Sequence, residues 1–103
     1  MATFHTLKIK DISKQTQDCS VITFDMPDNL SQEFEFTQGQ HLTLKALIDG
    51  QDTRRSYSIC SSMVDRQWQV AVKKIPGGVF SSYVNDVLQT GDTLQVAPPS
   101  GRF

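Results

Sequence analysis

The chain has 103 residues, of which 38% are hydrophobic and 20% charged, so it is long enough for one folded domain and unlike a disordered segment. Its formal net charge of −1 argues against the positive field that binding to nucleic acid or anionic membranes requires. Two cysteines are too few for a disulfide scaffold or a four-thiolate metal site, and no apolar run reaches the roughly 18 residues of a membrane span.

Residues 1–11 contain neither an apolar signal core nor a small-residue cleavage site. We therefore expect a cytoplasmic protein in which Cys19 and Cys60 are reduced. Apolar and polar residues alternate along much of the chain, and this alternation predicts half-buried strands. The alternating segments are 7–10, 22–26, 42–45, 68–72 and 94–96, with turn sequences at 27–29, 38–39, 49–50, 76–78 and 91–92.

One late segment predicts a helix instead. Its apolar residues, spaced as one helical face, are Phe80, Tyr83, Val84, Val87 and Leu88. Glycines precede this segment and Gly91 is placed to end it. The sequence thus predicts five or six antiparallel strands and one short helix, and a small barrel suits this pattern because it closes its own sheet edges.

Segment 54–60 reads Arg-Arg-Ser-Tyr-Ser-Ile-Cys and predicts a further strand. In a strand, Arg55 and Tyr57 share one face while Ser56 and Ser58 share the other. A guanidinium offers a planar fork of donors to a phosphate, a tyrosine ring stacks, and a serine hydroxyl both donates and accepts. The alternative is an exposed strand edge with ordinary cross-strand pairs, which composition alone favours.

Segment 73–81 leads from a predicted strand through two glycines into the predicted helix. The free N–H groups and the dipole of a helix's first turn attract an anion, and Gly77 and Gly78 carry no side chain to block one. Lys73 and Lys74 add positive charge. The alternative is a common strand-to-helix turn capped by a serine, so the double glycine alone is a weak signal.

The two segments reinforce each other. An antiparallel return places the strand that holds Arg55 beside the strand that leads into Gly77. The guanidinium and the helix start then face one anion from two sides, and the ring of Tyr57 stacks on whatever the phosphate is attached to. This combination predicts a phosphorylated, planar, aromatic ligand, either a nucleotide or a flavin.

These motifs resemble those of the ferredoxin–NADP reductase superfamily. Segment 55–58 resembles its Arg-x-Tyr-Ser motif, segment 72–74 resembles the strand that follows, and segment 77–81 resembles its Gly-Gly-x-x-Ser pyrophosphate loop. Segment 36–42 is similar to its Phe-x-Pro-Gly-Gln-(Tyr/His) motif, with glutamine in place of the proline, and segment 99–103 to the Pro-x-Gly-x-Phe that ends its FAD domain. In their detailed sequence, these motifs are most similar to those of the reductase subunits that serve bacterial phenylacetyl-CoA epoxidase complexes.

The resemblance implies a mainly all-β fold, a six-stranded antiparallel Greek-key β-barrel with one short α-helix, that binds FAD non-covalently. It implies that Arg55 pairs with the pyrophosphate, that Tyr57 stacks on the isoalloxazine ring, and that Ser58 hydrogen-bonds near flavin N5. Segment 78–81 is expected to bind the pyrophosphate through its amides and the Ser81 hydroxyl.

Backbone groups near Ile59 and in segment 72–74 are expected at the flavin edge, the ribityl chain or the adenosine part. No residue of this chain is expected to be catalytic. His5 and His41 have no carboxylate or cysteine at ligand spacing, so no metal site is expected. The candidate cofactor-binding residues are Arg55, Ser56, Tyr57, Ser58, Ile59, Val72, Lys73, Lys74, Gly78, Val79, Phe80 and Ser81.

The resemblance also implies a larger protein. Residues 1–103 are expected to be an excised FAD-binding domain, because no glycine-rich nicotinamide-binding segment and no closely spaced cysteines for a [2Fe-2S] cluster are present. In the intact reductase, NAD(P)H would reduce the flavin, and electrons would pass to a [2Fe-2S] centre and on to a di-iron oxygenase component in phenylacetate catabolism.

Other functions stay open at this point. An oligonucleotide-binding barrel without flavin would use a stacking groove of cations and aromatic rings, but the net charge and the double-glycine helix start speak against it. A docking module without a ligand leaves both motifs unexplained. FMN could take the place of FAD, but it lacks the pyrophosphate that the start of the helix is suited to bind. A reductase domain of this kind could also serve another electron acceptor.

Overall fold

The computed structural model describes residues 3–101, and the strands follow the predicted alternation of apolar and polar residues. In chain order the elements are β1 (His5–Thr16), β2 (Cys19–Asp25), α1 (Asp28–Ser31), β3 (His41–Ile48), β4 (Gln51–Ser58), the 3-10 helix η1 (Met63–Asp65), β5 (Trp68–Lys73), α2 (Val79–Asp86) and β6 (Thr93–Val96). None of the helices among these residues is long and apolar enough to cross a membrane.

The six strands form one antiparallel sheet in the order β4-β3-β6-β1-β2-β5. The sheet curls into a barrel, and its two outer strands meet at an isolated bridge between Ile59 and Val70. Next to this bridge the Cys60 N–H donates to the Gln69 carbonyl at 2.8 Å. The expected six-stranded Greek-key barrel is confirmed, although the sheet does not close along its full length.

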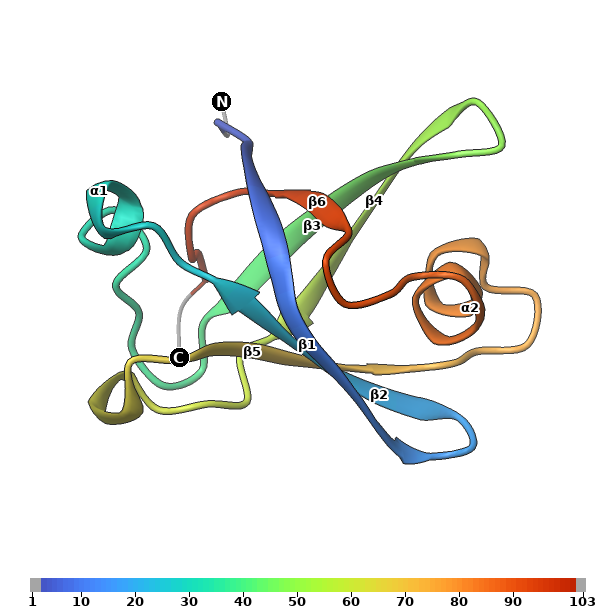
Figure 1. Cartoon of the computed structure of the whole chain (residues 1–103), viewed down its shortest axis with the longest axis horizontal. Coiled ribbons are helices and arrows are strands. Elements are labelled where there is room, and N and C mark those ends of the chain that lie inside the picture. Colours follow the sequence, from blue (N-terminus) through green and yellow to red (C-terminus); the bar gives the residue numbers. More distant parts are fainter. Residues whose placement is uncertain (1–2, 102–103) are drawn as a thin grey trace.

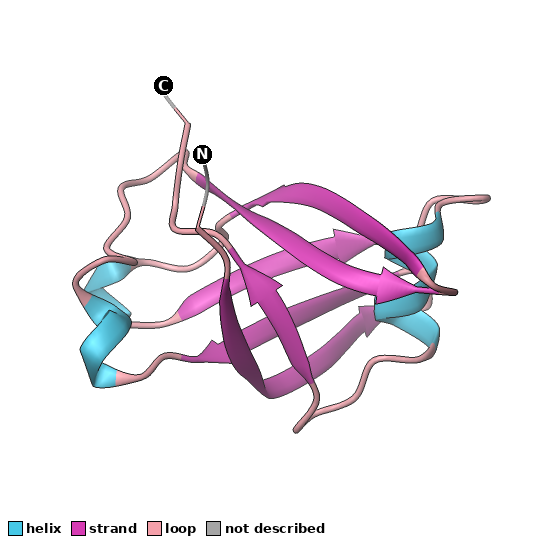
Figure 2. Ribbon diagram, turned by 90° about the horizontal axis from the view of Figure 1, so that it is seen from above, coloured by secondary structure: helices cyan, strands magenta, loops and turns pink. Residues whose placement is uncertain are grey.

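The two α-helices lie at opposite ends of the barrel (Figures 1 and 2). Helix α2 contacts β5, β3, β2 and β4, so it packs against both outer strands of the sheet, β4 and β5. This packing matters for the site, because it brings the start of α2 to the strand that carries Arg55.

Inward-facing side chains of the strands form the core. The predicted alternation holds in β5, where Trp68, Val70 and Val72 are buried. Phe34, in the connection between α1 and β3, is fully buried, and its carbonyl accepts a hydrogen bond from the Trp68 indole at 2.7 Å. Each large apolar side chain of this kind contributes about 1.5–3 kcal/mol through burial.

The late helix differs from its prediction at its C-terminal end. It ends at Asp86 rather than near Gly91, because Val87 leaves the helical conformation at φ −121°. The N–H groups of Val87 and Leu88 both donate to the Tyr83 carbonyl, and Leu88 still packs into the core. Gly91, at φ 95°, instead belongs to the turn before β6 and donates to the Ile9 carbonyl.

The expectation of a single helix was wrong. Helix α1 and the 3-10 helix η1 are additional, and they have only four and three residues, too few to show a helical period in the sequence. The last two residues of the Pro-x-Gly-x-Phe-like segment, 102–103, lie outside the described residues.

Candidate cofactor-binding site

The register between β3 and β4 sets the direction of the first motif. Leu42 lies opposite Tyr57, and Leu44 lies opposite Arg55. Directly opposed residues in an antiparallel pair share a face, so Arg55 and Tyr57 lie on the side of β4 that faces the barrel interior. Both leucines are fully buried, whereas Arg55 is exposed, because β4 is an outer strand that extends past the core.

The two adjacent arginines have different surroundings. Arg54 donates to the carboxylate of Asp52, and Lys45 lies 3.6 Å from the same carboxylate. The hydrogen bond from Arg54, together with both positive charges, lowers the pKa of Asp52 although burial opposes it. Arg55 has no carboxylate partner among residues 3–101, and its Nη1 donates to the Arg54 carbonyl at 2.6 Å. Arg55 is therefore the guanidinium available to an anion.

The second motif forms a tight turn, residues 75–78, which we call the glycine turn. Gly77 has φ +78°, a conformation that strains other residues, and the Gly78 N–H closes the turn on the Ile75 carbonyl at 2.7 Å. Helix α2 begins at Val79 with no capping side chain and no acidic residue in its first turn. Helix geometry leaves the first amides of α2 without an intrahelical acceptor, so the start of α2 carries unpaired donors and positive potential.

The two motifs meet at Val79. Arg55 and Val79 line one cleft of about 450 Å³, together with residues of the β3–β4 hairpin. Val79 also lines an adjoining cleft of about 540 Å³ with Gly77, Gly78 and Ser82. The structure therefore brings the Arg55 guanidinium and the uncapped helix start to neighbouring clefts, but not by the predicted pairing of the two strands. Strands β4 and β5 are opposite edges of the sheet that meet only at the bridge between Ile59 and Val70, and it is the packing of α2 against β4 that brings the two motifs together.

Tyr57 lies two residues after Arg55 on the same face of β4. Its ring is half-buried and lies 6.0 Å from the ring of Phe80, with the planes inclined by 37°. Burial raises the pKa of the Tyr57 phenol, and the charge of Arg55 partly opposes this rise. Tyr57 is thus a neutral aromatic surface with a positive charge nearby.

The remaining predicted residues of the first motif lie around this centre. The Ser56 hydroxyl is hydrogen-bonded to that of Thr43 at 2.8 Å, on the opposite face of the strand. Ser58 is exposed and lies opposite His41. Ile59 is half-buried and lines a separate cleft of about 750 Å³ at the end of the barrel where β4 and β5 meet.

Segment 72–74 is less available than the sequence suggested. The Val72 side chain is fully buried, and its carbonyl accepts a hydrogen bond from Asn85 at 3.2 Å. The Lys74 ammonium lies 2.8 Å from Asp86 at the far end of α2, and this hydrogen bond raises the pKa of Lys74. Of the two lysines in this segment, Lys73 is the one that is exposed and has no acidic partner among the described residues.

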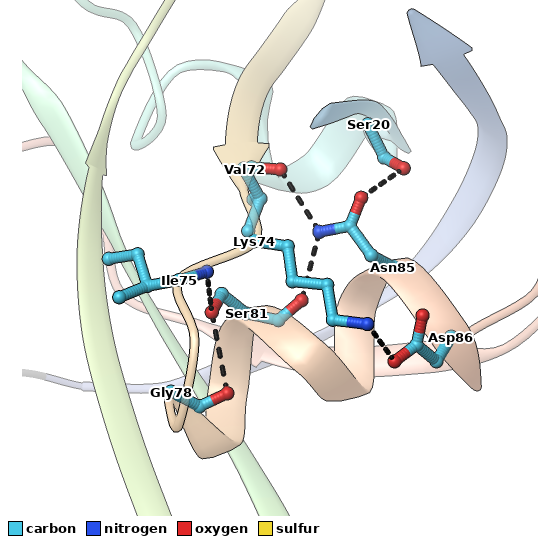
Figure 3. A network of polar contacts seen from close by, with 8 residues as sticks. All are labelled: Ser20, Val72, Lys74, Ile75, Gly78, Ser81, Asn85 and Asp86. Atoms are coloured by element: carbon cyan, nitrogen blue, oxygen red, sulfur yellow. Dashed lines mark hydrogen bonds and ion pairs between the residues drawn. The ribbon is translucent and has the colours of Figure 1, made fainter. Parts of the chain in front are cut away.

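The Ser81 hydroxyl is buried inside the loop rather than facing the clefts (Figure 3). It accepts the Ile75 N–H at 3.0 Å and is directed at the Gly78 carbonyl at 3.4 Å, so it ties α2 to the glycine turn. Sequence reasoning missed Asn85 and Ser20, whose side chains meet at 2.8 Å (Figure 3). No local pattern signals this pair, because the two residues lie on elements far apart in the chain.

The donors present fit a diphosphate attached to an aromatic ring. An unpaired guanidinium and unpaired amides supply the donors that phosphate oxygens require, and a half-buried phenol ring supplies a stacking surface. Within residues 3–101, no three His, Cys, Asp or Glu side chains lie close enough to hold a metal ion.

Comparison with known proteins agrees with this chemistry. Residues 6–103 match the family model of the oxidoreductase FAD-binding domain. The chain is 46% identical over 103 residues to one of the subunits of 1,2-phenylacetyl-CoA epoxidase from Escherichia coli, covering 100% of this chain and 29% of that protein.

Two solved structures share the fold. A ferredoxin NADP+ reductase from Neisseria gonorrhoeae with bound FAD and NADP gives a TM-score of 0.83 at 21% identity, over 99% of this chain and 40% of that one. Phthalate dioxygenase reductase, described as a modular structure for electron transfer from pyridine nucleotides to [2Fe-2S], gives a TM-score of 0.79 at 28% identity. The match covers 97% of this chain and 30% of that one. The chain therefore spans well under half the length of these proteins.

Proposed function

Because this chain belongs to the oxidoreductase FAD-binding domain family and has FAD as its cofactor, we propose that it holds the flavin of an NAD(P)H-dependent reductase. The reductase passes electrons through a [2Fe-2S] centre to an oxygenase component. The observation that carries the proposal is the cleft shared by Arg55 and Val79, where a guanidinium and a helix start face the same space.

When bound, FAD supplies the redox chemistry, by accepting a hydride and releasing single electrons. The chain's own residues bind and orient it. Arg55 and the amides of Val79, Phe80 and Ser81 hold the pyrophosphate, because donors from two directions match the two phosphates of a dinucleotide. Phe80 keeps the ring of Tyr57 in place for stacking.

Other predicted residues have supporting positions in this proposal. Ser58, exposed at the end of β4, donates to the flavin ring, and backbone groups of Ile59 and Lys73 contact the cofactor beside it. Ser56, Val72 and Lys74 shape the site without contacting FAD through their side chains, since the Ser56 hydroxyl and Lys74 ammonium are engaged and the Val72 side chain is buried.

The larger protein is part of the proposal. We place residues 1–103 as the FAD-binding domain, with NAD(P)H-binding and [2Fe-2S] domains elsewhere in the same polypeptide, because the relatives are about three times as long and one of them transfers electrons to [2Fe-2S]. Similarity to a 1,2-phenylacetyl-CoA epoxidase subunit favours a di-iron oxygenase of phenylacetate catabolism as the acceptor. The free thiols of Cys19 and Cys60 fit a cytoplasmic location.

The proposal is tested in two steps. This chain, mixed with FAD and desalted, should stay yellow and quench flavin fluorescence, and it should retain FAD better than FMN, which lacks the pyrophosphate. In the full-length protein, NADH or NADPH should bleach the flavin absorption and then reduce an iron–sulfur centre detectable by electron paramagnetic resonance. Binding of single-stranded oligonucleotides without flavin binding would contradict the proposal.

A further inference from the structure

A polar cluster lies behind the pyrophosphate site, on the side of α2 that faces the sheet (Figure 3). The Asn85 carboxamide donates to the Ser81 carbonyl at 2.9 Å and to the Val72 carbonyl at 3.2 Å. Its oxygen accepts the Ser20 hydroxyl at 2.8 Å. One side chain therefore links α2 to two strands, β5 and β2.

The position of Val72 shows which parts of the fold this link joins. Strand β5 is an outer strand of the sheet and meets β4 only at the bridge between Ile59 and Val70. Past this bridge no strand among residues 3–101 pairs with β5 on that side, and α2 packs against β5. Val72 lies opposite Ser20 in the β2–β5 ladder, and its carbonyl faces β2, as the Lys74 N–H does in donating to the Asp18 carbonyl two residues further along. Asn85 therefore adds a second donor to a carbonyl of this ladder, and Ser20, which is 2% exposed, orients the carboxamide so that its nitrogen faces that carbonyl.

The same side chain is connected to the glycine turn. Asn85 holds the backbone of Ser81, and the Ser81 hydroxyl holds the Ile75 N–H at 3.0 Å and faces the Gly78 carbonyl. A chain of hydrogen bonds thus runs from the sheet, through α2, to the turn whose amides open the helix. The N-terminal cap of α2 has no side chain of its own to fix it.

We propose that Asn85 is a positioning residue for the pyrophosphate site, a role that rests on the proposed binding of FAD there. It does not touch the cofactor. It fixes the orientation of α2, and with it the direction of the first amides of the helix relative to Arg55. Ser20 is its support, because it determines which end of the carboxamide faces the Val72 carbonyl.

The test compares Asn85→Ala with a matched control, Thr23→Val. Thr23 accepts a part-buried hydrogen bond from Gln69 at 2.9 Å, and these residues also join β2 and β5, but on a part of the strands away from α2. Asn85→Ala should weaken FAD binding roughly tenfold, as expected for lost hydrogen bonds that orient donors, and riboflavin binding less than twofold, because riboflavin has no phosphate. Thr23→Val should lower the thermal midpoint while changing neither affinity.

Ser20→Ala gives a second variant in case Asn85→Ala folds poorly, with a smaller loss of FAD affinity in the same direction. If Asn85→Ala binds FAD within twofold of the parent chain, or loses FAD and riboflavin equally, the positioning role is wrong. Amide hydrogen exchange at Ile75 tests it without a cofactor, since protection should fall in Asn85→Ala and not in Thr23→Val. Absence of FAD binding in the parent chain contradicts the proposed function, whereas unchanged Ile75 protection in Asn85→Ala contradicts this inference alone.

Discussion

The ring of Tyr57 on β4 lies 6.0 Å from the ring of Phe80 in the first turn of α2, with the two planes inclined by 37°. This contact joins the two motifs of the site directly. Phe80 is 1% exposed, so it is fixed by the core, and Tyr57 rests on it at the edge of that core. The Tyr57 ring and the first turn of α2 are therefore parts of one packed unit.

Replacement of Phe80 by leucine should disturb both parts. We expect Phe80→Leu to lower the free energy of unfolding by about 1–2 kcal/mol through lost packing. We also expect weaker FAD binding, because Tyr57 loses its support. Phe34→Leu is the control, since Phe34 is equally buried but lies in the connection before β3. Urea denaturation and flavin fluorescence titration on both variants measure the two effects, and equal flavin affinity in both would contradict the coupling.

The adjacent arginines provide a matched pair. Arg55→Ala should weaken FAD binding by about 10–150-fold, corresponding to about 1.5–3 kcal/mol for a charge-assisted hydrogen bond. Arg54→Ala should change it less than about threefold, because the guanidinium of Arg54 is already paired with Asp52. Fluorescence titration with FAD distinguishes the two, and an unchanged affinity in Arg55→Ala would refute its phosphate role.

The two glycines should respond for different reasons. A Cβ on Gly77 would meet nothing within 4 Å, so Gly77→Ala should cost only the backbone strain of φ +78°, about 1–2 kcal/mol. A Cβ on Gly78 would lie 2.7 Å from the Ser81 hydroxyl oxygen and 3.0 Å from the Ile75 carbonyl oxygen. Gly78→Ala should therefore break the bond between Ser81 and Ile75.

A double-mutant cycle checks this difference. The double variant Gly78→Ala/Ser81→Ala lacks the closer clash. It should therefore lose less free energy of unfolding than the two single variants lose together, by at least about 0.5 kcal/mol. Gly77→Ala combined with Ser81→Ala should be additive. Additivity in both cycles, measured by urea denaturation, would show that the Ser81 hydroxyl does not interact with the side chain at position 78.

Alkaline pH should act on Tyr57. Because burial raises the pKa of its phenol, the folded chain binds that proton more tightly than the unfolded chain. The resulting contribution to stability is fully present below the ordinary tyrosine pKa of about 10 and is lost as pH rises through the folded value. The difference in urea midpoint between the parent chain and Tyr57→Phe should therefore change above about pH 10. A difference that stays constant to higher pH would contradict this assignment.

The sequence by itself determined most of the strands and the two motifs of the candidate site, because these depend on local patterns. Alternation placed the strands, and the side chains of Arg55 and Tyr57 share a face since a strand has a period of two. The double glycine marked the start of α2 for the same kind of reason, since a turn at positive φ is a property of a few adjacent residues.

Only the tertiary structure decided which groups are free to bind. The strand period places Arg55, and not Arg54, on the face of Tyr57, but only the fold shows that Asp52 pairs with Arg54 and leaves Arg55 without a carboxylate partner among residues 3–101. Lys74 is paired with Asp86, the Ser81 hydroxyl is used inside the loop, and Asn85 gained a role through its contact with Ser20. Each of these outcomes depends on which side chains the packing of α2 and the pairing of the strands bring within hydrogen-bond distance, and a local pattern does not contain that information.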